Sequence, residues 1–65
     1  MKWIHTIDKY GNMQMVNTNL IARIEYPVNL DILTIVFANG DTIEEVYEQE
    51  ESRRQRYEEI QTLLT

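Results

Sequence analysis

The sequence predicts an α+β fold: an antiparallel β-meander of four to five short strands with one C-terminal amphipathic helix packed on one face. Up to residue 47, short runs of alternating apolar and polar side chains are separated by turn-forming residues, which is typical of strands. An Asn-Gly pair at residues 39–40 lies between two apolar runs and indicates a hairpin. From residue 48, apolar side chains recur every three or four positions, as on one face of a helix.

The 65 residues are expected to form a single domain, with the meander at residues 1–47 and the helix at residues 48–65. This length is near the lower limit at which a chain folds without a disulfide, a metal or a partner. The sequence has no cysteine, so neither a disulfide framework nor a thiolate metal site is available. A partner chain is therefore the economical source of extra buried surface.

The first two strands are expected at residues 3–7 and 13–16. Trp3, His5 and Ile7 alternate with polar residues and share one face of a half-buried strand, with Ile4 as the exception. The Tyr-Gly-Asn sequence at residues 10–12 predicts the turn between them, because Gly and Asn tolerate positive φ. The second strand carries Met13, Met15 and Val16, and the two adaptable methionine side chains suit either a core or a contact surface.

Residues 17–19 (Asn-Thr-Asn) form a turn-rich segment whose side chains compete for backbone hydrogen bonds. The following residues, 20–26, are expected to make a short turn that leads into a third strand. Ile21 and Ile24 also fit a single helical turn, so that alternative stays open. Pro27 ends the strand, because proline donates no hydrogen bond to a sheet.

The hairpin at residues 30–47 is predicted to turn at Asn39-Gly40 through a two-residue type I′ turn. Counting outward from that turn places apolar side chains on both faces. One face carries Ile32, Val36, Ile43 and Tyr47, and the other carries Leu33, Ile35, Phe37 and Val46. Because one helix covers one face, the face with Phe37 is expected to be covered by another chain.

The C-terminal helix has a predicted start near Ser52, since Ser52 and Gln55 have the spacing of a capping box and acidic residues lie close by. Its apolar stripe consists of Tyr57, Ile60, Leu63 and Leu64. This stripe is expected to cover one face of the meander.

Charge argues against a nucleic-acid ligand. The net charge is −5, and the whole excess of acids lies in residues 41–65, where the three arginines are outnumbered. Binding to phosphates requires a basic surface. No segment approaches the roughly 18 apolar residues of a membrane helix, and the start of the chain lacks the apolar region of a signal peptide. We therefore expect no membrane insertion and a cytoplasmic location.

Residues for catalysis are few. His5 is the sole histidine, and its neighbours Trp3 and Ile7 favour a packed or surface imidazole over a catalytic base. The acids around Glu44 do not have the spacing of a calcium-binding EF-hand loop. Both glycines lie in predicted turns, so no loop is suited to hold a phosphate. The sequence thus predicts no enzyme, no cofactor and no metal site, and it identifies no small-molecule ligand.

Three stretches resemble the small flagellar proteins of the FlbD-like (SwrD) family. They are NTNLI at residues 17–21, Ile24-Glu25, and LTIVFANGDTI at residues 33–43. The similarity extends over residues 16–43, fewer than half of the chain, and its start and its acidic tail depart from the family pattern. The resemblance implies a β-meander and a non-enzymatic role linked to motility.

The favoured hypothesis is a protein-interaction or structural module that self-associates, as a homo-oligomer, or docks on a larger protein partner. The alternative is an inhibitor or ligand-sequestering protein of a phage or mobile element that binds a host component. In the alternative, acids at the helix start would recognise a basic protein surface. The predicted partner-binding residues are Trp3, Leu33, Ile35, Phe37 and Val46 on the strands, and Glu48, Glu50 and Glu51 near the helix start.

Overall fold

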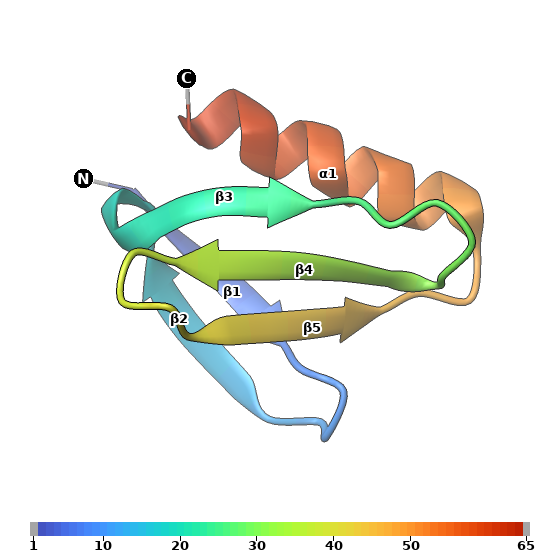
Figure 1. Cartoon of the computed structure of the whole chain (residues 1–65), viewed down its shortest axis with the longest axis horizontal. Coiled ribbons are helices and arrows are strands. Elements are labelled where there is room, and N and C mark those ends of the chain that lie inside the picture. The colour runs from blue at the N-terminus through green and yellow to red at the C-terminus, as the bar shows by residue number, and fades with distance from the viewer. Residues whose placement is uncertain (1, 65) are drawn as a thin grey trace.

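The computed structural model describes residues 2–64 and contains five strands, one short 3₁₀ helix and one α-helix (Figure 1). The predicted α+β class is confirmed. In chain order the elements are β1 (Trp3–Ile7), β2 (Met13–Asn17), η1 (Thr18–Leu20), β3 (Ile21–Glu25), β4 (Ile32–Phe37), β5 (Thr42–Val46) and α1 (Glu50–Leu64).

The strands form two sheets rather than one continuous meander. β1 and β2 make an antiparallel hairpin, and β3, β4 and β5 make a separate antiparallel sheet in that order. In Figure 1 the hairpin lies behind the larger sheet and crosses it obliquely, and α1 runs along the side of β3. The change of layer occurs at η1, where the Thr18 backbone N–H still bonds to the Lys2 carbonyl at 2.9 Å and the Asn17 side chain caps the turn.

The core lies between the β3–β4–β5 sheet on one side and the hairpin and α1 on the other. Its buried apolar residues come from each of these parts. Leu33 and Ile35 of β4 and Ile60 of α1 have no accessible surface, and the hairpin adds Ile4 and Val16. Each Å² of apolar surface that is removed from water stabilises the folded state by about 25 cal/mol, and this is the main contribution that holds such a small domain together.

The β1–β2 and β4–β5 hairpins each turn through a three-residue loop of the same kind. The predicted two-residue type I′ turn at Asn39-Gly40 is therefore wrong. Gly40 donates its N–H to the Phe37 carbonyl, and Phe37 donates to the Asp41 carbonyl, at 2.9 and 2.8 Å. Only the glycine has positive φ, at 95°, whereas a type I′ turn requires positive φ at both central residues. The loop at residues 9–11 repeats this pattern, with Gly11 at 83°.

One extra loop residue shifts the register of β4 and β5 by one position. Ile35 lies opposite Ile43, and Leu33 lies opposite Glu45. The sheet is therefore apolar mainly on one face. Its other face, which no described element covers in Figure 1, carries five polar side chains and three apolar ones. These are Arg23, Glu25, Thr34, Thr42 and Glu44, with Ile32, Val36 and Val46.

Replacement of Gly40 by alanine is expected to lower the free energy of unfolding by about 1–2 kcal/mol, measured by urea denaturation. A Cβ at Gly40 meets no atom within 4 Å, so the cost is that of the positive φ alone. Gly40→Asn is the matched control, and it should cost less because asparagine tolerates this region. Equal losses for the two variants would contradict this account of the loop.

The helix begins at Glu50, before the predicted capping box. The Arg53 N–H already bonds to the Gln49 carbonyl at 3.2 Å, so Ser52 lies within the first turn and does not cap it. Ile60 is fully buried, and Tyr57 and Leu63 pack against the core. Three of the four residues of the predicted stripe therefore face the sheet, whereas Leu64 remains partly exposed.

Candidate functional site

The predicted contact face at residues 33–46 does not exist as one surface. Leu33 and Ile35 are fully buried in the core, and Phe37 is half-buried against it. Val46 lies on the opposite, open face of the sheet with half of its surface exposed. The grouping was wrong because it rested on the two-residue turn, and the three-residue loop moves every β5 side chain to the other face.

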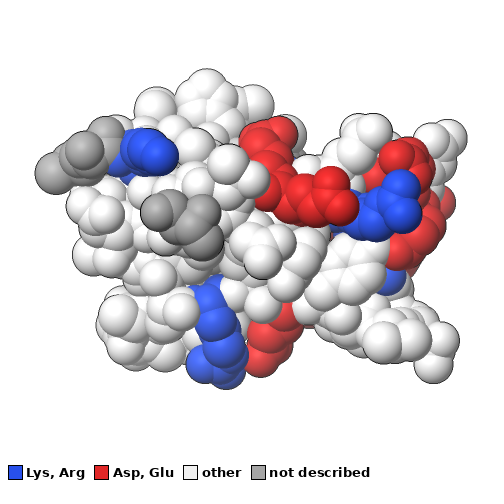
Figure 2. Space-filling view, turned by 90° about the horizontal axis from the view of Figure 1, so that it is seen from above, with Lys and Arg blue, Asp and Glu red and all other residues white. Residues whose placement is uncertain are grey.

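The three predicted acidic residues lie near the start of α1, but two of them already have partners in the chain. Glu50 pairs with Arg53 at 2.8 Å and accepts a hydrogen bond from the Tyr26 hydroxyl, which lowers the pKa of Glu50 and raises that of Tyr26. Glu51 pairs with Arg54 at 2.7 Å. Glu48 makes no ion pair with any residue from 2 to 64. Figure 2 shows this mixture of acids and bases at the end of the molecule where α1 begins.

A group of exposed apolar side chains lies on the hairpin of β1 and β2. Alternate residues of each strand point away from the core, and the register places them opposite one another: His5 faces Met15, and Ile7 faces Met13. The exposed fractions are 53% for Trp3, 52% for Ile7, 69% for Met13 and 60% for Met15. We call the side of the hairpin formed by Trp3, His5, Ile7, Met13 and Met15 the outer face.

The sequence pattern favoured the wrong side of β1. The side with Trp3 and His5 carries the larger, aromatic side chains, yet it is Ile4 and Thr6 that face the core. Ile4 pairs with buried Val16 on β2, and this compact pair fits against the core residues of the larger sheet. Among the predicted site residues, Trp3 is therefore the one that lies on the outer face.

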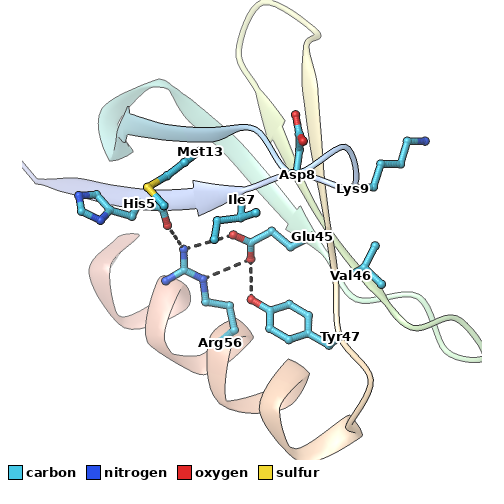
Figure 3. Close-up of a pocket in the computed structure, with 10 residues that line it drawn as sticks. His5, Ile7, Asp8, Lys9, Met13, Glu45, Val46, Tyr47 and Arg56 are labelled. Carbon is cyan, nitrogen blue, oxygen red and sulfur yellow. Dashed lines mark hydrogen bonds and ion pairs between the residues drawn. The ribbon is translucent and has the colours of Figure 1, made fainter.

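A groove of about 590 Å³ borders the outer face where β1 approaches the end of β5 (Figure 3). Ile7 and Met13 line its apolar side. The opposite side is formed by Tyr47 and by Arg56, whose guanidinium donates to the carbonyl of His5. A second groove, of about 460 Å³, borders the other end of the outer face and is lined by Trp3, Met15, Leu20 and Phe37.

The charged side chains beside the first groove form ion pairs and hydrogen bonds with one another. Arg56 pairs with buried Glu45 at 3.2 Å and with Glu59 at 2.7 Å, and the Tyr47 hydroxyl donates to Glu45 at 2.8 Å. Burial, followed by the hydrogen bond to Glu45, raises the pKa of Tyr47. Burial by itself lowers the pKa of Arg56, but its contacts with Glu45 outweigh that effect and raise it. The network thus fastens α1 and β5 to β1.

No group of three acidic or histidine side chains within residues 2–64 is placed to hold a metal ion. In the same part of the chain, no helix has both the length and the apolar character needed to cross a membrane. The geometry therefore defines a small α+β domain whose most distinctive surface is an exposed apolar hairpin face between two open grooves. Comparison of the chain with family models, curated proteins and solved structures gives no match.

Proposed function

We propose that this chain is a non-enzymatic protein-interaction module and that the outer face of β1 and β2 is its contact surface. The observation that carries the proposal is the exposure of four large apolar side chains on one side of a single hairpin: Trp3, Ile7, Met13 and Met15. The largest apolar patch of an ordinary monomer measures roughly 300–600 Å² and is often functional. The outer face gathers four exposed large apolar side chains in a chain of only 65 residues.

The chemistry of the outer face suits a protein partner. Tryptophan and methionine are enriched in protein interfaces, the first as a rigid anchor and the second as an adaptable side chain. The two bordering grooves extend the contact surface to Leu20 and Phe37 at one end and to Tyr47 at the other. A role linked to motility, suggested by the resemblance to flagellar proteins, would be exerted through this same surface.

The alternative, in which Glu48, Glu50 and Glu51 bind a basic host protein, has less support. Release of Glu50 and Glu51 would first require the loss of their ion pairs with Arg53 and Arg54. The outer face requires no such loss, because its apolar side chains are already exposed. We therefore assign the partner to the hairpin and treat charge reversal at the three acids as a control.

Met15→Glu is expected to weaken association with the partner, whether a second copy or another protein, by at least about thirtyfold, or roughly 2 kcal/mol. The substitution places a charge at the middle of the outer face, and it should leave folding intact because Met15 points away from the core. The measurement is sedimentation equilibrium of the pure chain, together with titration of any protein that copurifies with it.

Thr42→Glu is the matched control, since it adds the same charge on the open face of the other sheet at an exposed position. It should preserve association, as should charge reversal at Glu48, Glu50 and Glu51. If Thr42→Glu weakened association as much as Met15→Glu, or if folded Met15→Glu associated normally, the outer face would not be the contact surface.

A further inference from the structure

His5 occupies the middle of the outer face. Five residue pairs join β1 to β2, and the third of them is His5 with Met15. Trp3 and Ile7 flank the histidine along its own strand, and Met13 lies across from Ile7. Any contact centred on the outer face therefore encloses the imidazole among apolar side chains.

None of the five residues of the outer face is an acid, a lysine or an arginine, although the chain has a net charge of −5. The charged residues of α1 that border Trp3, His5 and Met15 are Arg56 and Glu59, and these two pair with each other. Two copies of an acidic chain repel one another over most of their surfaces. A surface without formal charge is the place where two copies meet without repulsion and without burial of an unpaired charge. Such a surface is also self-complementary about a twofold axis, because each apolar side chain meets another apolar side chain.

The exposed area is consistent with a second copy. Four large apolar side chains and His5 are exposed, and the two bordering grooves extend this surface toward the roughly 800 Å² per partner of a standard interface. Two such hairpins stacked face to face would form a sandwich of two layers about 10 Å apart. Each copy would thereby gain the cover that its own chain does not provide.

We propose that a second copy of this chain covers the outer face about a twofold axis, and that protonation of His5 separates the two copies. This inference rests on the proposed function and adds the partner and its regulation. Near the twofold axis, the imidazoles of both copies lie close together in an apolar contact. Two imidazolium ions there would repel one another and lose their hydration, whereas two neutral imidazoles would not.

The charged groups near His5 do not offset this effect. From α1 come Arg56, which binds the His5 carbonyl, and Glu59, which is paired with Arg56. Glu45 of β5 and Tyr47, which directly follows β5, bond to each other and lie on the carbonyl side of β1, whereas the imidazole points away from them (Figure 3). β2 contributes Met15. At the turn end of β1, Asp8 accepts hydrogen bonds from the loop backbone, and Lys9 pairs with Glu44.

Within residues 2–64, the His5 imidazole therefore forms no ion pair with an acid. Histidine is the side chain that ordinarily changes charge between pH 5 and 8. A histidine that must release a proton when two chains associate weakens the association by up to tenfold per pH unit, and two histidines by up to about a hundredfold.

The test is sedimentation equilibrium of the full chain at pH 8 and pH 5.5, at equal ionic strength. We expect a dimer at pH 8 and a dissociation constant at least about tenfold higher at pH 5.5. The control is His5→Gln, which cannot take up a proton in this range and should remain a dimer at both values. Acidification brings the chain closer to its isoelectric point of about 4.6, which by itself would favour association.

The outcomes separate this inference from the proposed function. A wild type that is monomeric at both pH values shows that the occupant is not a second copy, and binding of another protein that Met15→Glu abolishes would still support the module. A dimer that is sensitive to Met15→Glu but equally stable at both pH values overturns the role of His5 alone. A dimer that loses its pH dependence in His5→Gln supports both parts.

Discussion

Replacement of Leu33 by alanine is expected to lower the free energy of unfolding by about 3–4 kcal/mol. Leu33 has no accessible surface and packs among Ile4, Ile43 and Ile60, where the strands and the helix leave little room to collapse around a smaller side chain. A domain of this size has a total stability of roughly 3–10 kcal/mol, so the variant should be partly or fully unfolded at room temperature. Urea denaturation followed by circular dichroism measures the loss.

Val46→Ala is the control for Leu33→Ala, because a two-residue turn at Asn39-Gly40 puts both residues on one face of the hairpin. The observed register puts Val46 on the open face with 50% of its surface exposed, so its truncation should cost less than about 1 kcal/mol. Similar losses for the two variants would mean that Val46 is buried with Leu33. That result would contradict the three-residue loop.

Arg53→Ala is expected to lower the free energy of unfolding by about 2–4 kcal/mol. The Arg53 side chain is almost fully buried, and one of its nitrogens donates to the carbonyls of Pro27 and Ile32 at 2.8 and 3.0 Å. Its guanidinium also lies 4.1 Å from the centre of the Tyr26 ring. Truncation leaves both carbonyls without their donor and frees the start of α1 from the loop between β3 and β4. The measurement is again urea denaturation.

Two further variants separate these contacts from charge alone. Arg54→Ala removes the same charge one position later, where the ion pair with Glu51 is exposed, and it should cost less than about 0.5 kcal/mol. Arg53→Lys keeps the charge but should recover only part of the loss, because an ammonium group does not reproduce the planar fork and the stacking on Tyr26. Full recovery by lysine would show that charge, and not geometry, holds the loop.

The apolar hairpin face was the part of the molecule least accessible to sequence reasoning. The sequence predicts Trp3 as a partner-binding residue, and it is compatible with either a core or a contact position for Met13 and Met15. Local pattern favoured burial of the side with Trp3, because that side carries the larger side chains. The choice depends on which side of the hairpin meets Leu33, Ile35 and Ile60, and those residues lie far along the chain.

The structural roles of Arg53 and Arg56 also depend on contacts that the sequence does not indicate. In the sequence they are two members of a cluster of arginines beside many acids, and such clusters are usually solvated. In the structure each holds together elements distant in sequence, Arg53 through the loop before β4 and Arg56 through Glu45 and the backbone of β1. The capping spacing at Ser52 was a weaker guide than these contacts, which stabilise a helix start two residues earlier.

By itself, the sequence determined where the strands, the turns and the helix lie, because alternation, glycine positions and helical spacing act over a few neighbouring residues. Only the tertiary structure decided which side of each strand is buried. In β5 the decision depends on one additional loop residue before Asp41, and in β1 it depends on how well Ile4 and Val16 fit against the larger sheet. Because strand side chains alternate with a period of two, a shift of one residue exchanges core and surface, and no local pattern reports that shift.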